Sequence, residues 1–111
     1  MVSPTYFQTA GTDVVEGTIM TSPYLSNDTN AKTKAFAAAY KKAYSADAEF
    51  HCAKAYDGMN IFITAMKKTS KDLSGPKLIA AFRSVHYDGL LGQFKYDDTG
   101  LALHATQIAV I

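Results

Sequence analysis

The chain has 111 residues, of which 48% are apolar and 19% are charged, and its formal net charge is +1. These values are typical of an ordinary globular domain, and no apolar run approaches the roughly 18 residues that can span a bilayer. The basic residues are scattered or paired with acids, as on the solvent-facing sides of helices, so neither nucleic acid nor membrane is indicated as a partner.

The first half of the chain predicts one strand and one helix. Residues 14–21 mix β-branched with other apolar residues and stop at a Ser-Pro pair, a pattern typical of a strand. After a polar loop, Asn30 or Asp28 can cap a helix over residues 31–44. One face of this helix is apolar: Phe36, Tyr40, Ala43 and Tyr44.

The clearest helical periodicity lies in residues 49–68. Its apolar positions form one continuous stripe: Cys52, Ala55, Tyr56, Met59, Phe62, Ile63 and Met66. We therefore predict that this is the main core helix, with Met59 and Ile63 fully buried.

A third helix is predicted to follow the loop at residues 69–72. Ser74-Gly75-Pro76 places a proline in its first turn, and the helix should end near Ser84. Either Leu78 or Ile79 would be buried together with Phe82.

The last quarter of the chain predicts a hairpin. Gly89 and Gly92 can adopt positive φ, and Phe94 and Tyr96 lie on one face of a strand. The next turn should return the chain as a second strand over residues 101–111.

The residues of this turn are Asp97-Asp98-Thr99-Gly100, in which Asp98 with Gly100 suits a tight reversal. The turn resembles a calcium loop, but it lacks the spaced oxygen ligands and the closing glutamate that calcium requires. We therefore predict a turn and no metal.

No catalytic or cofactor constellation is present in the sequence. His51, His86 and His104 are far apart, and no metal-ligand spacing occurs. Cys52 is the only cysteine, which excludes an internal disulfide, and it is predicted to be a buried structural thiol. Gly89 and Gly92 lack the third glycine and following helix of a phosphate loop.

Residues 87–100 read Tyr-Asp-Gly-Leu-Leu-Gly-Gln-Phe-Lys-Tyr-Asp-Asp-Thr-Gly. With Tyr87 and Tyr96 in place of two phenylalanines, this resembles the Phe-Asp-Gly-x-x-Gly-x-x-x-Phe-Asp-x-x-Gly pattern of type I periplasmic binding proteins. These are the branched-chain amino acid receptors of ABC transporters. Three further segments follow the order of that family: residues 10–23, 36–44 and 55–59.

The resemblance implies an α/β fold in which helices pack on a small sheet, as part of a lobe with a C-terminal β-hairpin. Members of the family are considerably longer, with two lobes joined by crossing strands. The resemblance therefore implies that residues 1–111 are a single partial domain from the C-terminal part, with residues 1–24 and 105–111 near the crossing strands. Met1 does not open a secretory signal, so a periplasmic location is implied by the family alone.

The function that the resemblance implies is binding, without catalysis. The parent would hold a branched-chain amino acid or a related small solute in a cleft between its lobes and deliver it to the membrane permease of an ABC transporter. Two alternatives are a ligand-sensing receptor ectodomain of the same fold and a non-catalytic interaction module.

The resemblance also suggests site residues. An aromatic residue at the start of the second helix often lines the apolar part of the ligand pocket, and Phe50 or His51 holds that position, with Phe50 preferred. Phe50 could instead pack as core. Tyr56 could reach the cleft, although its stripe position favours core.

The segment Thr21, Ser22, Pro23 and Tyr24 corresponds to a crossing between lobes. Its proline would restrain a hinge, and its loop-type residues could absorb the backbone change of closure.

Strand edges are the last feature that the resemblance predicts. The strands at residues 14–21 and 106–111 belong beside partners outside this chain, which would leave apolar edges exposed. We therefore expect a homodimer or a strand-exchanged assembly, through these residues: Ile19, Ile108, Val110 and Ile111.

Overall fold

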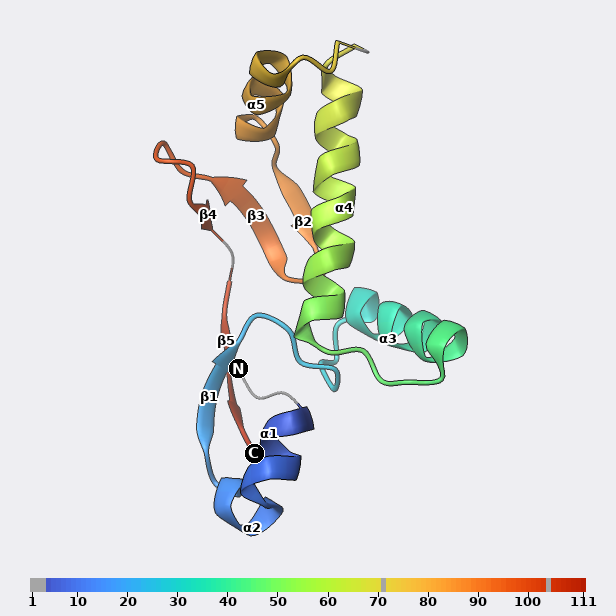
Figure 1. The fold of residues 1–111 in the computed structure, drawn as a ribbon, viewed down its shortest axis with the longest axis vertical. Coiled ribbons are helices and arrows are strands. Elements are labelled where there is room, and N and C mark those ends of the chain that lie inside the picture. Colours follow the sequence, from blue (N-terminus) through green and yellow to red (C-terminus); the bar gives the residue numbers. More distant parts are fainter. Residues whose placement is uncertain (1–3, 71, 104) are drawn as a thin grey trace.

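The structure is a computed structural model that describes residues 4–70, 72–103 and 105–111. In chain order its elements are α1 (Pro4–Ala10), α2 (Thr12–Val15), β1 (Ile19–Ser22), α3 (Ala31–Tyr44), α4 (Phe50–Lys68), α5 (Gly75–Arg83), β2 (Tyr87–Gly89), β3 (Gly92–Tyr96), β4 (Ala102–Leu103) and β5 (Gln107–Val110) (Figure 1). No helix within the described ranges is long and apolar enough to cross a membrane.

An antiparallel ribbon of β1 and β5 joins two ends of an elongated molecule (Figure 1). The short helices α1 and α2 lie at one end, and α3 to α5 with the β2–β3–β4 sheet lie toward the other. The radius of gyration is 16.6 Å, whereas a compact chain of this length has about 13 Å. Much of the apolar surface of this chain therefore lies outside any core formed by its own residues.

The bounds of the three long helices confirm the sequence predictions closely. The side chain of Asn30 caps α3, because its Oδ1 accepts a hydrogen bond from the Lys32 N–H at 2.8 Å. Pro76 lies in the first turn of α5, as predicted. In α5, Leu78 and Phe82 pack against the core while Ile79 is 59% exposed. Of Leu78 and Ile79, the buried residue is therefore Leu78.

The predicted buried face of α4 is wrong. The residues of α4 that the structure buries are Ala53, Asp57, Ile61 and Ala65. Met59 is 60% exposed and Ile63 is half-buried. Ala53 and Ala65 allow α5 and the β2–β3 hairpin to approach α4 on the buried side, whereas Tyr56, Met59 and Phe62 lie outside this contact and are 51%, 60% and 38% exposed.

The N-terminal strand is shorter than predicted. Residues 12–15 form the helical turn α2, in which Val15 is buried, and the strand begins only at Ile19. Gly17 has a φ of 82° between the two elements. This positive φ reverses the chain and prevents a continuous strand from residue 14.

The C-terminal hairpin has more strands than predicted. Tyr87–Gly89 is itself a strand that pairs with β3. The predicted return strand, residues 101–111, is divided: β4 pairs with β3, and β5 pairs with β1. His104, between them, lies outside the described residues. The strands expected to lack partners, β1 and β5, thus pair with each other.

The turn before β4 depends on Asp97 and not on Asp98. The Asp97 Oδ1 accepts hydrogen bonds from the Thr99 N–H at 2.9 Å, the Thr99 hydroxyl at 2.7 Å and the Leu101 N–H at 2.8 Å. Gly100 supplies the positive φ of the turn, 89°. The sequence analysis placed this turn correctly but named Asp98 as its aspartate, whereas the structure uses Asp97.

Candidate functional site

An open cavity of about 650 Å³ lies where the end of β1 meets the start of α4. Its wall combines aromatic and polar side chains from α1, β1, the two loops that flank α3 and the start of α4, including Phe7, Ser22, Tyr24, Asp47, Glu49 and Phe50. Two of the segments that the sequence selected, residues 21–24 and the first turn of the second helix, therefore meet at one cavity.

Phe50 is the first residue of α4 and lies in this wall. Its ring is half-buried and packs against the core cluster that contains Tyr24 and Leu91. The Lys54 ammonium lies 5.7 Å from the ring centroid. The ring is thus fixed from behind and reaches the cavity, so both expectations for Phe50 hold geometrically, and its role toward a ligand stays a prediction.

Ser22 and Tyr24 make the crossing segment locally rigid. The Ser22 hydroxyl donates to the Tyr24 carbonyl oxygen at 2.7 Å and accepts from the Tyr24 N–H at 3.3 Å. Both residues are buried, Thr21 is exposed and Pro23 is half-buried. The structure places Thr21 and Ser22 in strand β1, so these two are not loop residues. The hinge role of the segment stays a prediction.

The Tyr24 hydroxyl is buried and has no hydrogen-bond partner among the described residues. Burial, and secondarily the nearby Cys52 thiol, raises the pKa of this phenol. Tyr24 therefore stays neutral at ordinary pH and can still donate a hydrogen bond.

The charges along the cavity wall are acidic. Lys41 Nζ forms an ion pair with Asp47 at 2.9 Å, and His51 Nδ1 lies 3.6 Å from a carboxylate oxygen of Glu49. Within the described part of the chain, no lysine, arginine or histidine lines the cavity. This wall consequently favours a solute with a positively charged or hydrogen-bond-donating group.

The other two candidate ligand residues lie away from this cavity. His51 is exposed beside Glu49, with its ring 5.4 Å from that of Phe50. Tyr56 lines a different groove, of about 470 Å³, between α3, α4 and β2, where its ring centroid is 5.1 Å from that of Phe36. The structure therefore does not group Phe50, His51 and Tyr56 in one site.

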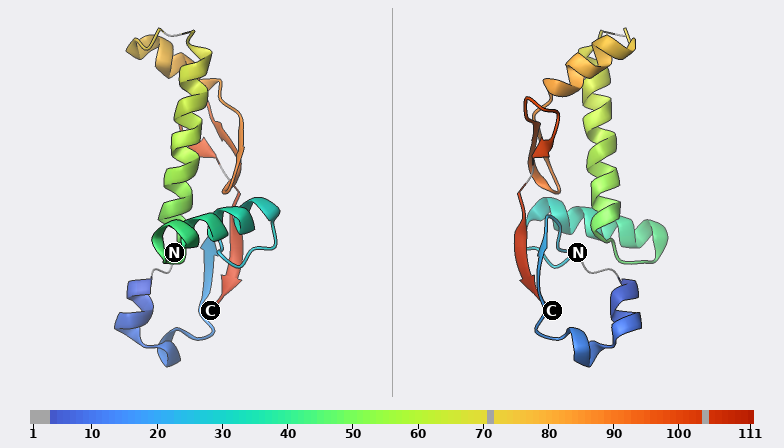
Figure 2. Two further views of the ribbon diagram at one scale, coloured as in Figure 1. Left: turned by 90° about the vertical axis from the view of Figure 1, so that its right-hand side faces the viewer. Right: turned by 60° about the vertical axis from the view of Figure 1, so that its left-hand side comes forward.

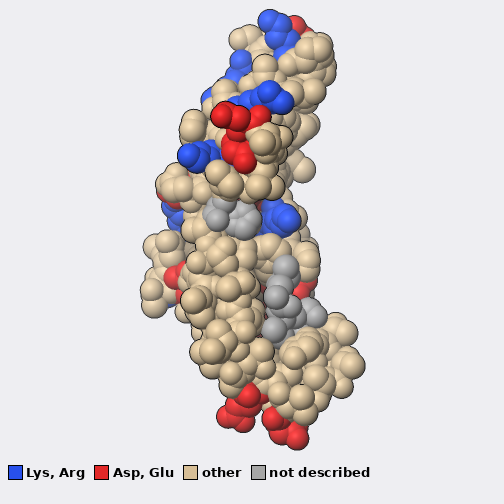
Figure 3. All heavy atoms as spheres, turned by 90° about the vertical axis from the view of Figure 1, so that its left-hand side faces the viewer, with Lys and Arg blue, Asp and Glu red and all other residues tan. Residues whose placement is uncertain are grey.

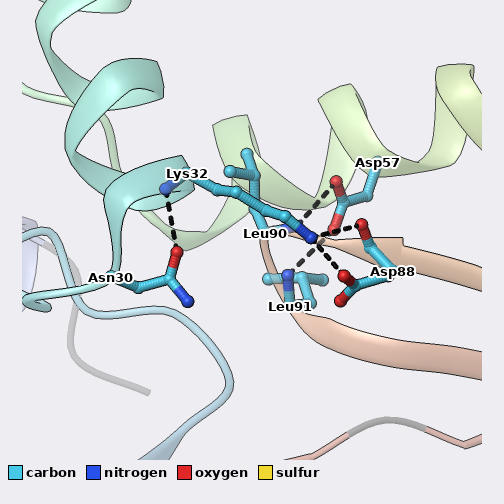
Figure 4. Close-up of polar contacts among 6 residues, drawn as sticks. All are labelled: Asn30, Lys32, Asp57, Asp88, Leu90 and Leu91. Carbon is cyan, nitrogen blue, oxygen red and sulfur yellow. Dashed lines mark hydrogen bonds and ion pairs between the residues drawn. The ribbon is translucent and has the colours of Figure 1, made fainter.

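The sequence analysis missed a buried carboxylate on the inner face of α4. Asp57 is 4% exposed, and its two oxygens accept hydrogen bonds from the Leu90 N–H at 3.0 Å and the Leu91 N–H at 2.9 Å (Figure 4). The contact joins α4 to the turn between β2 and β3. An aspartate in the middle of an apolar helix was the available signal, because buried carboxylates need partners.

This contact, and not a positive φ, requires glycine at position 89. Of Gly89 and Gly92, only Gly92 has a positive φ, 84°. A Cβ on Gly89 would lie 2.3 Å from the Asp57 Oδ2. Beside it, the Lys32 ammonium of α3 binds the Asp88 carboxylate and, at 3.1 Å, the Asp88 carbonyl oxygen (Figure 4). Residues 88–91 are therefore held by α3 and α4 together.

Comparison with known proteins identifies the family of this chain and solved structures with a similar fold. The family model of periplasmic binding proteins matches residues 1–111. No curated protein matches the chain.

Among solved structures, the chain is similar to a solute binding protein of an ABC transporter from Rhodopseudomonas palustris BisB5, in complex with 3,4-dihydroxy benzoic acid. The identity is 27% and the TM-score 0.81, over 88% of this chain and 27% of that protein. A leucine binding protein from Thermotoga maritima MSB8 gives 22% identity and a TM-score of 0.81, over 98% and 31%. The chain therefore spans less than a third of the length of either relative.

Proposed function

The chain belongs to the periplasmic binding protein family, and from this premise we propose that it forms one wall of the ligand cleft of an ABC-transporter solute-binding protein located in the periplasm. The observation that carries the proposal is the convergence of Phe50, Ser22 and Tyr24 on one open cavity. A cavity that is open on one side suits a cleft whose second wall comes from another part of the protein. The protein would bind its solute there and present it to a membrane permease, without catalysis.

We propose an amino acid with an apolar side chain, of the branched-chain type, as the solute. The Phe50 ring and the neighbouring apolar residues suit the side chain, and the Glu49 carboxylate suits the ammonium group. The relative from Rhodopseudomonas palustris was solved with 3,4-dihydroxy benzoic acid, which has no ammonium group. The acidic wall of this cavity favours an amino acid over such an aromatic acid.

Thermal shift measurements on the polypeptide from the complete gene would test the proposal, with leucine, valine and 3,4-dihydroxybenzoate as probes. A ligand at a hundred times its Kd should stabilise the protein by about 2.7 kcal/mol. We expect stabilisation by leucine or valine, and none of the three probes should stabilise the 111-residue chain, which has only one wall. Stabilisation by the aromatic acid alone would reject the amino acid, and three flat responses from the complete protein would reject both classes.

The Phe50→Ala variant tests the assigned residue. Loss of a contacting aromatic ring should weaken leucine binding by about tenfold to a hundredfold, which corresponds to about 1.5–3 kcal/mol. Phe62→Ala, which removes a ring outside the cavity, is the matched control and should bind leucine normally. Equal affinities for the two variants would remove Phe50 from the site.

A further inference from the structure

Helix α4 has apolar side chains on two opposite sides. Successive residues of a helix are about 100° apart, so Met59 lies about 180° from the middle of the buried face, between Asp57 and Ile61. We call the side of Met59 the outer face; its members are Ala55, Tyr56, Met59, Phe62, Ile63 and Met66. Tyr56, Met59 and Phe62 are 51%, 60% and 38% exposed. A helix that is apolar on opposite sides is usually covered on both.

The described elements leave the outer face open along the middle of α4. In the left view of Figure 2, α4 lies in front of the β2–β3 hairpin, with α3 and α5 at its two ends. The centroid of the Phe36 ring in α3 is 5.1 Å from that of Tyr56, and the centroid of the Phe82 ring in α5 is 5.6 Å from that of Phe62. The apolar surface therefore reaches from α3 to α5.

The chain exposes more surface than a compact protein of its size. Its accessible surface is 7636 Å², whereas a folded monomer of this mass exposes about 6,000 Å². The excess of about 1,600 Å² is larger than the roughly 800 Å² that each partner contributes to a standard interface. The area left uncovered is therefore large enough for a stable contact.

The outer face suits an apolar, uncharged partner surface. Between residues 55 and 66 the only charged side chain is Asp57, which is buried on the other side of α4. Charge appears at the edge, in the groove beside Tyr56, where the Lys32 ammonium binds the Asp88 carboxylate. An uncharged middle with a polar rim is typical of a protein interface.

Gly58 marks a point of close approach beside the outer face. It lies three residues after Ala55 and four before Phe62, so these positions are neighbours on the helix surface. Glycine inside a helix lowers stability relative to alanine. A Cβ at position 58 would meet no atom within 4 Å, so packing among the described residues does not explain this glycine. Close contact with a segment outside this chain would explain it.

The remainder of the same polypeptide is the occupant that the comparisons favour. The parts of the Rhodopseudomonas palustris and Thermotoga maritima proteins that match this chain are 27% and 31% of their lengths. Each relative therefore has more than twice as much further chain. A segment of the same polypeptide has an effective concentration of the order of millimolar, which a second copy would have to reach in order to compete.

We propose that the outer face of α4 is an internal interface, covered by an apolar surface from the remainder of the same polypeptide that approaches α4 most closely at Gly58. The inference rests on the family of the chain and on the length of its relatives, and it does not depend on which solute is bound. Helix α4 would be a middle layer, with the β2–β3 hairpin on its inner side. Met59 and Ile63 would then be buried in the complete protein.

Hydroxyl-radical footprinting of the polypeptide from the complete gene, without solute, tests the proposal. Mass spectrometry would compare the modification rate of each side chain in the native and the urea-unfolded protein. We expect Met59 and Phe62 to react about tenfold more slowly in the native protein, or slower still, whereas a 60% exposed Met59 would be slowed only slightly. Tyr44, which is 68% exposed and lies outside the outer face, is the internal control and should stay reactive.

The Gly58→Ala variant of the complete protein tests the close approach. In this chain the new methyl group would enter open space and alanine would favour the helix, so the change by itself should raise the melting temperature. If another segment lies against Gly58, the same change should lower the melting temperature instead, because the methyl group would have to displace that segment.

Three results would overturn the proposal. Equal modification rates of Met59 in the native and the unfolded protein would place solvent on the outer face. Protection of Met59 that disappears on dilution would assign the face to a second copy. A higher melting temperature of Gly58→Ala would exclude the close approach at Gly58. Because no solute is present, loss of the protection would reject this interface and leave the proposed function standing, and failure to bind leucine would leave the footprint unchanged.

Discussion

The inner and outer faces of α4 differ in a way that the residues alone do not suggest. The inner face has two alanines, Ile61 and the carboxylate of Asp57, yet it is buried and the carboxylate oxygens are paired. The opposite, outer face has the apolar side chains Tyr56, Met59 and Phe62, yet Tyr56 and Met59 are more than half exposed. Burial of a helix face is therefore decided by whether another element can reach it, and small residues allow the closer approach.

The β1–β5 ribbon repeats the pattern of the outer face. Ile19, Ile108 and Val110 lie on one side of the ribbon and are 72%, 74% and 67% exposed. Figure 3, which views the molecule from the ribbon side, shows a surface that is mostly neither basic nor acidic. The homodimer or strand-exchanged assembly through these strands, which the sequence suggested, thus stays a prediction.

The largest expected effect comes from breaking the inner face at Asp57. Asp57→Ala would leave the amides of Leu90 and Leu91 without their acceptor, at a cost of roughly 1–3 kcal/mol for each buried donor. Urea unfolding should show a loss of roughly 2–6 kcal/mol, which is a large share of the roughly 5–15 kcal/mol that is usual for a folded domain.

Asp88→Ala is the control for this change, because it removes a carboxylate from β2, next to the turn that Asp57 contacts. Its exposed ion pair with Lys32 should contribute about 1 kcal/mol or less. If the two variants unfold at the same urea concentration, the Asp57 contact does not stabilise the fold.

The next effect compares the two faces directly. Ile61→Ala creates a cavity on the inner face, where Ile61 is 6% exposed, and should cost roughly 2–5 kcal/mol. Met59→Ala on the outer face should change the stability of the dilute, monomeric chain by about 0.5 kcal/mol or less. If Met59→Ala lowers the melting temperature more than Ile61→Ala does, the buried face of α4 is the one that the sequence predicted.

The smallest effect concerns acid sensitivity at the hairpin that covers the inner face. Hydrogen bonds from the Thr99 side chain, then from the Leu101 N–H, lower the pKa of Asp97. The unfolded chain therefore takes up this proton more readily than the folded chain. The stabilisation is complete above the ordinary pKa of aspartate and is lost as the pH falls below about 4.

Asp97→Asn should reduce the loss of stability on acidification in melts recorded from neutral pH to pH 3. Asp98→Asn changes the same charge in the same turn but keeps these hydrogen bonds, so it should retain the acid dependence of the unchanged chain. The pKa values of Asp28 and Asp72 are also lowered by hydrogen bonds, so part of the acid dependence should persist in Asp97→Asn.

Features that depend on neighbouring residues were predictable from the sequence. The cap at Asn30, the proline in the first turn of α5 and the bounds of the long helices follow from interactions within about four residues. The signature at residues 87–100 indicated the family, and the family model matches the whole chain. The meeting of residues 21–24 with Phe50 at one cavity needed the three-dimensional arrangement of segments that are far apart in the sequence.

The sequence by itself determined where the three long helices begin and end and where the turn at residues 97–100 lies, because capping, proline placement and turn chemistry act locally. Its motifs also indicated the family. The tertiary structure decided which face of α4 is buried, that Asp57 holds the turn at Leu90 and Leu91, and that β5 pairs with β1. The Asp57 contact and the β1–β5 pairing join residues more than thirty positions apart. Periodicity shows that a helix has an apolar face, but only packing shows what covers it.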